Sequence, residues 1–211
     1  MSATADNISP VPTDGIPTRT VSVAEIHDFA KAVGLSHVAA GRCSTVLMFE
    51  LYCRAVVPVA ALNPAKIVAE VRGLEGVGNP VGTKRAAQFK HPPLKGFWKK
   101  HYLLDGLGSM AKNVQLGFGP DRRRLRQVIE ENYNPKTAHL PPETVSKNIA
   151  NAVVNLYAYR SRKQRLTGEW IIYGKYDGKN YYLCLAAHDE PDNDIFERIK
   201  RGCSGEFPFL F

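Results

Sequence analysis

The first half of the chain contains a well-marked amphipathic helix. Ser22 and Glu25 form a capping-box pair, in which each side chain reaches a backbone amide at the helix N-terminus, and Gly34 supplies the stop. Apolar residues recur between them at helical spacing on one face. The pattern therefore predicts a helix that starts at Ser22, with an inner face made of Val23, Ile26, Phe29, Ala30 and Val33.

Two further segments of the first half have helical features. The run 43–57 is ambiguous between a buried helix and strands, but its length and the i,i+4 pair of Glu50 and Arg54 favour a helix. The dipeptide at 63–64 is Asn-Pro, which suits the cap and the first turn of a helix. We therefore expect a helix after residue 63, followed by a glycine-rich loop at 76–84.

Two helices are expected between residues 121 and 166. Asp121 is placed to cap a helix that extends to Asn132, and Pro141 and Pro142 mark the start of a longer helix at about 143–166. Both segments keep apolar residues at helical spacing. The inner faces are predicted to hold Leu125, Val128 and Ile129 in the first helix and Val145, Ile149, Val153 and Leu156 in the second.

The pattern changes near the C-terminal end of the chain. Segments 170–176 and 179–188 are short and rich in aromatic and β-branched residues, and Asp-Gly stands between them at 177–178. This arrangement is typical of a two-residue β-hairpin. A helix over about 192–203 and a possible edge strand in 206–211 complete the predicted elements.

These elements predict an α+β fold, with a mainly helical body and a small antiparallel β-sheet, a hairpin plus an edge strand, at the C-terminal end. We expect three segments. Residues 1–20 form a flexible tail, because prolines stand among small polar residues there. Residues 21–140 form a helical region that contains the basic aromatic segment 84–101. Residues 141–211 hold the long helix, the hairpin, the last helix and the terminal strand.

Composition narrows the class of protein. With 211 residues and 44% apolar content, the chain is long enough to bury a core. Its four cysteines show no paired spacing and its first residues lack a secretory signal, so we expect free thiols in a reducing cytoplasm. The longest apolar run is interrupted by charged residues and a proline, which predicts no membrane partner.

The charge of the chain points to a polyanionic partner. Lys and Arg number 28 against 20 Asp and Glu, which gives a formal net charge of +8. The excess is concentrated in three runs, at 84–101, 121–126 and 160–165, and the first of these also carries Phe89, Phe97 and Trp98. Cations at this density bind phosphates, and flat rings stack on bases. The alternative is a solvated basic surface that only maintains solubility.

Nucleic acid, with RNA favoured, is therefore the expected partner. The contacts are expected from the basic runs and from rings and cations of the predicted hairpin, where Tyr173 and Lys175 share one face. Tyrosines on such a sheet also serve simply in packing. The candidate nucleic-acid-binding residues are Lys84, Arg85, Lys90, Trp98, Lys99, Lys100, Arg160, Arg162, Arg165, Tyr173 and Lys175.

RNA cleavage is the leading chemical hypothesis. Cleavage without a metal needs a base for the 2′-hydroxyl proton, an acid for the leaving oxygen and a cation for the charged phosphorane. His91, His101 and Lys95 supply these residue types within one bent segment. The alternative is that both histidines are ordinary surface or hydrogen-bonded residues. His188, at the end of the second hairpin strand, could lie at the rim of a site or in a solvated loop.

The sequence gives little support for cofactor or metal chemistry. The run GVGNPVGTK at 76–84 resembles a phosphate-binding loop, but Thr83 precedes Lys84, whereas such a loop needs Ser or Thr after the lysine. Neither a HExxH motif nor paired CxxC spacing occurs. We therefore predict neither a metal site nor a cofactor.

The last part of the chain, from RLTGEWIIYGKYDGKNYYLCLAAHD through the following helix, resembles the core of small bacterial toxin ribonucleases of the barnase, EndoU, colicin and RelE type. The resemblance implies helices packed on a short antiparallel sheet whose face cleaves RNA without metal, using variable sets of His, Lys, Arg and Tyr. By location near the strands, it implicates Arg165, Thr167, Tyr173, Lys175 and His188.

We therefore expect a metal-independent endoribonuclease that acts as a toxin or defence effector, for which an acidic inhibitor protein would be a natural partner. The alternatives are a non-catalytic module that binds nucleic acid or an acidic protein, and a structural component of a larger assembly.

Overall fold

The structure, a computed structural model, describes residues 20–56, 62–79 and 81–211. A four-stranded antiparallel sheet lies at the centre of this part of the chain. The strand order follows the sequence, and every neighbouring pair is antiparallel. Eight α-helices surround or extend this sheet within the described residues, so the α+β class is confirmed. The predicted tail at 1–20 lies outside the described residues except for Thr20. The strands are β1 (Ala87–Gln88), β2 (Trp98–Tyr102), β3 (Glu169–Tyr176) and β4 (Lys179–Ala186).

The predicted hairpin is confirmed as strands β3 and β4. Asp177 and Gly178 have φ angles of 46° and 70°, so both turn residues adopt the left-handed conformation that a tight two-residue hairpin requires. Strand β2, which the sequence analysis did not predict, pairs with the other edge of β3 and places Lys100 opposite Ile171.

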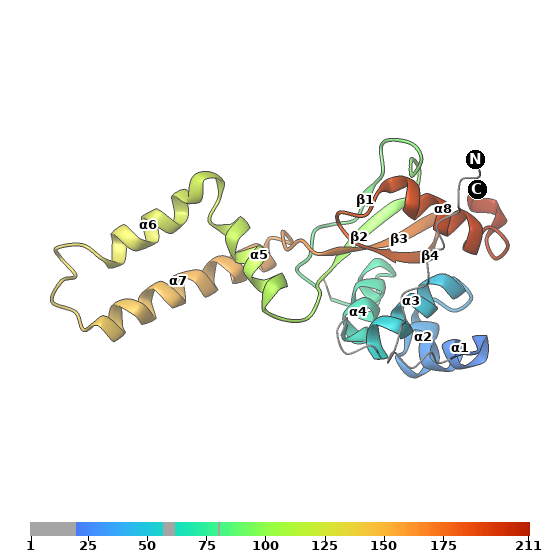
Figure 1. Cartoon of the computed structure of the whole chain (residues 1–211), viewed down its shortest axis with the longest axis horizontal. Helices are drawn as coiled ribbons and strands as arrows, with labels where there is room; N and C mark the ends of the chain where they lie inside the picture. The colour runs from blue at the N-terminus through green and yellow to red at the C-terminus, as the bar shows by residue number, and fades with distance from the viewer. Residues whose placement is uncertain (1–19, 57–61, 80) are drawn as a thin grey trace, which may run out of the picture.

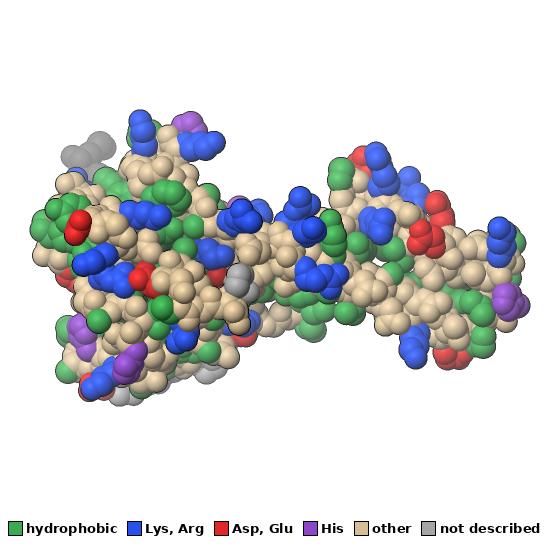
Figure 2. All heavy atoms as spheres, turned by 180° about the vertical axis from the view of Figure 1, so that it is seen from behind, with side chains coloured by type: hydrophobic (Ala, Val, Ile, Leu, Met, Phe, Trp, Pro, Cys, Tyr) green, Lys and Arg blue, Asp and Glu red, His purple; other side chains and the backbone are tan. Residues whose placement is uncertain are grey.

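Strands β2 and β3 are neighbours in the sheet, although a long helical arm lies between them in sequence (Figure 1). The arm projects from the body that holds the sheet, and a narrow neck joins the two parts (Figures 1 and 2). Helix α7 packs against both α5 and α6, so the helices on either side of residue 140 form one unit. The arm consists of α5 (Leu107–Gly117), the 3₁₀ turn η2 (Pro120–Arg122), α6 (Arg123–Asn132) and α7 (Pro142–Arg162).

The helix predicted over 121–132 forms, but Asp121 does not cap it. Asp121 has a φ angle of 56° and lies in the preceding turn, where its backbone is left-handed. The N-cap of α6 is Arg122, whose side chain makes no capping hydrogen bond. The glycine and proline at 119–120 thus shift the helix start past the aspartate.

One face of the sheet is covered by the helices of the first half of the chain (Figure 1). Three predictions for these helices are confirmed: the capping box of Ser22 and Glu25, the helical state of the run that begins at residue 43, and the cap at Asn63, which accepts a hydrogen bond from the Ala65 amide. Residue 57 of that run lies outside the described residues. The helices are α1 (Val23–Ala32), α2 (Leu35–Val38), α3 (Thr45–Val56) and α4 (Pro64–Leu74).

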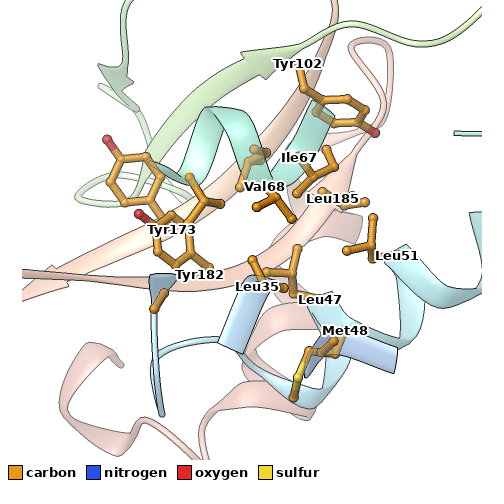
Figure 3. Close-up of a cluster of buried hydrophobic side chains, with 14 of the residues drawn as sticks. Leu35, Leu47, Met48, Leu51, Ile67, Val68, Tyr102, Tyr173, Tyr182 and Leu185 are labelled. Atoms are coloured by element: carbon orange, nitrogen blue, oxygen red, sulfur yellow. The ribbon is translucent and has the colours of Figure 1, made fainter. Parts of the chain in front are cut away.

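Two hydrophobic clusters, one on each face, hold the helices to the sheet. In the first, Leu47 and Leu51 of α3 and Ile67 of α4 meet Tyr182 and Leu185 of the sheet (Figure 3). All five are fully buried. Burial of such side chains stabilises a fold by about 1.5–3 kcal/mol each, so this cluster anchors the body.

The second face is covered by α8 (Asp192–Cys203), which is the helix that the sequence predicts over about 192–203, and by the last residues of the chain. The possible terminal strand was a wrong prediction, because Pro208–Leu210 form a 3₁₀ turn instead. Phe207 is buried in the second cluster, and the Phe209 ring contacts Tyr176 and Tyr181. These aromatic residues thus pack the C-terminal segment on the face of the sheet, and it does not extend the sheet as an edge strand.

Helix α5 is fastened to the start of β3 by a buried amide. Asn113 is fully buried, its Nδ2 donates to the Thr167 carbonyl at 2.8 Å, and its Oδ1 accepts from the Thr167 amide at 2.8 Å. One side chain therefore satisfies both backbone groups of a residue at the base of the arm.

Among the described residues, no helix has the length and apolar character needed to cross a membrane.

We predict that Asn113→Ala lowers the free energy of unfolding by about 1–3 kcal/mol, since it leaves two buried backbone groups of Thr167 unpaired. Denaturant titration measures the change, and faster amide exchange at Thr167 would locate it. Gln115→Ala, on the exposed side of the same helix, is the matched control. Equal stability of the two variants would show that Asn113 does not fasten the arm.

Candidate nucleic-acid interface

The basic aromatic segment 84–101 forms a hairpin at the edge of the sheet. The Phe89 amide donates to the Phe97 carbonyl at 2.9 Å, and both rings are 7% exposed in the second cluster. Phe89 and Phe97 therefore face inward, whereas four of the cations and His91 face solvent. The exposed side chains of this segment include Lys84, Arg85, Lys90, His91 and Lys95.

The rings proposed to stack on bases are less accessible than expected. Tyr173 is 1% exposed, so its ring is not available to a base, and this candidate was wrong. Trp98 is half-buried, stacks on Tyr173 with 6.3 Å between ring centroids, and lies 4.2 Å from the Lys175 ammonium. Only the outer part of Trp98 and the exposed Lys175 remain for a ligand.

Lys100 has a structural role. Its ammonium lies 3.1 Å from a carboxylate oxygen of Glu70 and donates to the Thr83 hydroxyl at 2.6 Å. Glu70 is 1% exposed, and burial raises the pKa of its carboxyl. A buried carboxylate needs such a partner, so Lys100 is not free to bind phosphate, and its assignment as a ligand was wrong.

The structure separates His91 and Lys95 from His101. Phe89 and Phe97 close the edge hairpin, and His91 and Lys95 lie in its tip. His101 is four residues beyond Phe97 along β2, which corresponds to about 13 Å of extended chain. The ring contacts of His101 are with Trp170 and His188, and the tip that carries His91 and Lys95 lies beyond Phe97. The structure therefore does not bring the proposed catalytic set of His91, His101 and Lys95 together.

His101 instead lies beside His188. Their ring centroids are 5.9 Å apart, and the ring of Trp170 lies 4.8 Å from that of His188. The Nδ1 atom of His101 is 2.8 Å from the Gly168 carbonyl oxygen, and the His188 amide donates to the Glu169 carboxylate. Strand ends thus position this pair, which sequence reasoning missed because it depends on the order of β2, β3 and β4.

The surroundings of this pair are cationic and contain an unused donor. Lys99 lies with its ammonium 3.8 Å from the Trp170 ring, and burial lowers the pKa of this lysine. The buried Nε1 of Trp170 has no hydrogen-bond partner among the described residues. An ammonium beside two imidazoles suits an anionic ligand.

His101 is held in its neutral form. It is 7% exposed, and burial lowers its pKa to about 4, with additional repulsion from Lys84, His188 and Lys99. A neutral imidazole can accept a proton from a reacting hydroxyl, which is the role of a general base.

The structure brings the start of segment 84–101 together with the run 160–165. The Arg85 Nε donates to the Gln164 side-chain oxygen at 3.3 Å, and the Lys84 amide donates to the Leu166 carbonyl at 2.9 Å. Figure 2 shows Lys and Arg side chains gathered over the neck. Here we define the neck surface as the exposed cations Lys84, Arg85, Arg162, Lys163 and Arg165.

Arg160 differs from its neighbours at the neck. Its guanidinium donates to the Arg165 carbonyl at 2.6 Å, and its buried Nε has no partner among the described residues. Burial, together with the charge of Arg165, lowers the pKa of Arg160. Arg160 therefore binds the backbone just after the end of α7, and it also lines a groove between α6 and α7.

No cluster of three or more His, Cys, Asp or Glu side chains suited to a metal ion occurs in the described part of the chain.

No protein-family model matches the sequence, and neither the curated proteins nor the solved structures provide a significant match. The resemblance to toxin ribonucleases therefore stays a prediction.

We predict that His101 makes stability dependent on pH. Because the folded protein holds His101 with a pKa of about 4, against about 6.5 in an unfolded chain, folding favours the neutral imidazole. This contribution is complete above pH ~6.5 and is lost as the pH falls through ~4. Relative to His101→Gln, the wild-type protein should lose up to about 3 kcal/mol over this range.

Denaturant titrations at several pH values measure this difference, and NMR titration of the imidazole gives the pKa directly. His27→Gln, which changes an exposed histidine on α1, should keep the wild-type pH dependence. An imidazole of His101 that titrates near 6.5 would contradict the prediction.

Proposed function

We propose that the protein binds RNA, with the neck surface as the main contact for the sugar–phosphate backbone. The observation that carries the proposal is the meeting of Lys84 and Arg85 with the run 160–165, which are distant in sequence. The five neck cations are exposed, and the structure gives none of their side chains an acidic partner among the described residues.

A cluster of exposed cations suits the phosphate backbone of a flexible strand. Phosphates recur at regular intervals along a nucleic acid, and each one that a lysine or arginine neutralises releases counterions. The exposed cations Lys90 and Lys95 in the tip of the edge hairpin lie beside the same sheet and would extend the contact. The half-buried Trp98 with Lys175 would supply a further contact for a base or phosphate.

We expect the triple variant Lys84→Ala/Arg85→Ala/Arg165→Ala to bind a single-stranded RNA oligomer at least about tenfold more weakly at moderate salt. The slope of log affinity against log salt should fall in magnitude by about 2, because roughly three phosphate contacts are lost at ~0.7 each. Fluorescence anisotropy at several salt concentrations measures both quantities.

The control is the triple variant Lys31→Ala/Lys179→Ala/Arg201→Ala, which removes the same charge from exposed positions on α1, β4 and α8. Both variants change the net charge equally, so a general electrostatic effect would weaken them alike. Equal affinities and slopes for the two variants would refute the neck surface as the RNA contact.

A second candidate function, metal-independent cleavage of the bound RNA, is favoured by the closeness of His101 and His188. In this reaction, neutral His101 takes the proton of the 2′-hydroxyl, and the 2′-oxygen attacks the adjacent phosphorus. The bond to the 5′-oxygen breaks, and His188 in its protonated form donates a proton to that oxygen. The products are a 2′,3′-cyclic phosphate and a 5′-hydroxyl, and Lys99 would stabilise the charged phosphorane.

We predict that the purified chain cleaves RNA in EDTA and that His188→Gln slows cleavage by about 10²-fold or more, the usual effect of losing a general acid. RNA affinity should stay unchanged, because His188 lies outside the neck surface. Gel analysis of labelled RNA between pH 5 and 8 measures the rate, and His91→Gln, in the hairpin tip, is the control. RNA that is bound but intact at every pH would eliminate cleavage and leave binding standing.

A basic RNA-binding surface of this kind also suits an acidic inhibitor protein, whose carboxylates would occupy the positions of the phosphates. An endoribonuclease with such a partner would act as a toxin or defence effector. Its compartment would be the cytoplasm, where the four free cysteines stay reduced.

A further inference from the structure

A groove of about 920 Å³ runs along the arm between α6 and α7. Its lining combines an apolar floor with a basic rim. The cations Arg123 and Arg124 come from α6, and Arg160, Arg162 and Arg165 come from the end of α7 and the segment after it. The apolar side chains are Leu116, Phe118, Val128, Ala152, Leu156 and Tyr159.

The arm buries very little apolar surface for its length. Helix α7 has 21 residues and no buried one, and in α5 and α6 only Asn113 and Val128 are buried. A helix in a globular protein normally covers a stripe of apolar residues. In the groove, however, Leu116 and Tyr159 remain 47% and 48% exposed. Two helices have thus formed a hairpin whose apolar groove is left open.

Within the described part of the chain, the rim of the groove holds more cations than acids. Five arginines line it, and the single acid is Glu131, which already accepts a hydrogen bond from Gln127 at 2.7 Å. The Nε of Arg160 is buried and has no hydrogen-bond partner among the described residues. A carboxylate placed at the inner end of the groove would offset the repulsion between Arg160 and Arg165.

We propose that this groove binds an acidic amphipathic helix of a partner protein. Apolar residues at helical spacing would cover the floor, and glutamates or aspartates beside them would pair with the arginines. The size is suitable, because one turn of a helix taken as a cylinder ~10 Å wide occupies roughly 420 Å³, so the groove holds about two turns.

Other occupants fit less well. An RNA strand would gain contacts with the rim, but the floor consists mainly of aliphatic side chains and offers few rings for stacking. A second copy of this chain carries the same net charge of +8, and its arm would bring arginines against arginines.

The test uses the full chain and a labelled synthetic peptide of roughly 14 residues, about four turns, with leucines on one helical face and glutamates on both flanks. One comparison peptide has the same composition in shuffled order, and another has lysine in place of each glutamate. The acidic amphipathic peptide should bind at least about tenfold more tightly than both, since it alone matches floor and rim.

Two matched pairs of variants locate the peptide. Arg124→Ala and Tyr159→Ala should each weaken binding by about fivefold or more, because arginine and tyrosine dominate such interfaces. Arg126→Ala, on the same helix but outside the groove, and Tyr133→Ala, beyond the groove, should have no effect. Circular dichroism of each variant checks that the arm stays helical.

Two results would overturn the inference. The first is equal affinity for the ordered and shuffled acidic peptides, which would show attraction by charge alone. The second is binding of an oligouridine that is weakened by Tyr159→Ala and Arg124→Ala while the amphipathic peptide is not, which would make the groove an RNA site.

Discussion

The structure depends on one constraint, that β2 and β3 pair side by side although the whole arm is inserted between them. Tyr102 before the arm and Glu169 after it must therefore meet within one strand spacing of about 4.8 Å. Gly168 allows the approach, since a Cβ atom there would lie 2.0 Å from the Tyr102 carbonyl oxygen. The bridge of Thr83 with Leu166 and the hydrogen bonds of Asn113 complete the closure. The neck surface and the pair of His101 and His188 depend on this closure, because both lie where the arm meets the sheet.

Internal ion pairs decide which cations remain for a ligand. In the body, Arg42 pairs with Glu75, Lys100 with Glu70, and Arg198 with Glu50 and Glu190. These pairs hold helices and strands of the body together, and partial burial raises the pKa of Glu50 to about 7. The neck cations have no such partners among the described residues, and the excess of positive charge therefore has its effect there and on the arm.

Local signals in the sequence predicted the helix caps and the turn that depend only on neighbouring residues. Ser22 with Glu25, Asn63 with Pro64, and Asp177 with Gly178 each determine a cap or a turn within a few residues, and all three formed as expected. Strand β2 carries no such signal, because its sequence, WKKHY, places two lysines and a histidine in the sheet.

The acid that neutralises Lys100 comes from α4, thirty positions earlier in the chain, and no local pattern reveals such a partner. The same limit applies to the candidate site. The sequence identified His101 and His188 separately, but only the order of the strands places their rings together. The sequence also predicted the basic runs at the surface, where most of their cations lie, but their meeting at the neck depends on the closure of the arm.

The groove and the neck surface share Arg162 and Arg165, and this overlap couples the two proposed ligands. Both ligands are polyanions, and a guanidinium that holds a carboxylate is not free for a phosphate. Arg160 reinforces the coupling, since it lines the groove and also holds the backbone of Arg165 through its guanidinium. A helix bound in the groove would therefore act on RNA binding at the neck without covering the histidine pair. Competition of this kind follows from shared arginines alone and needs no change of conformation.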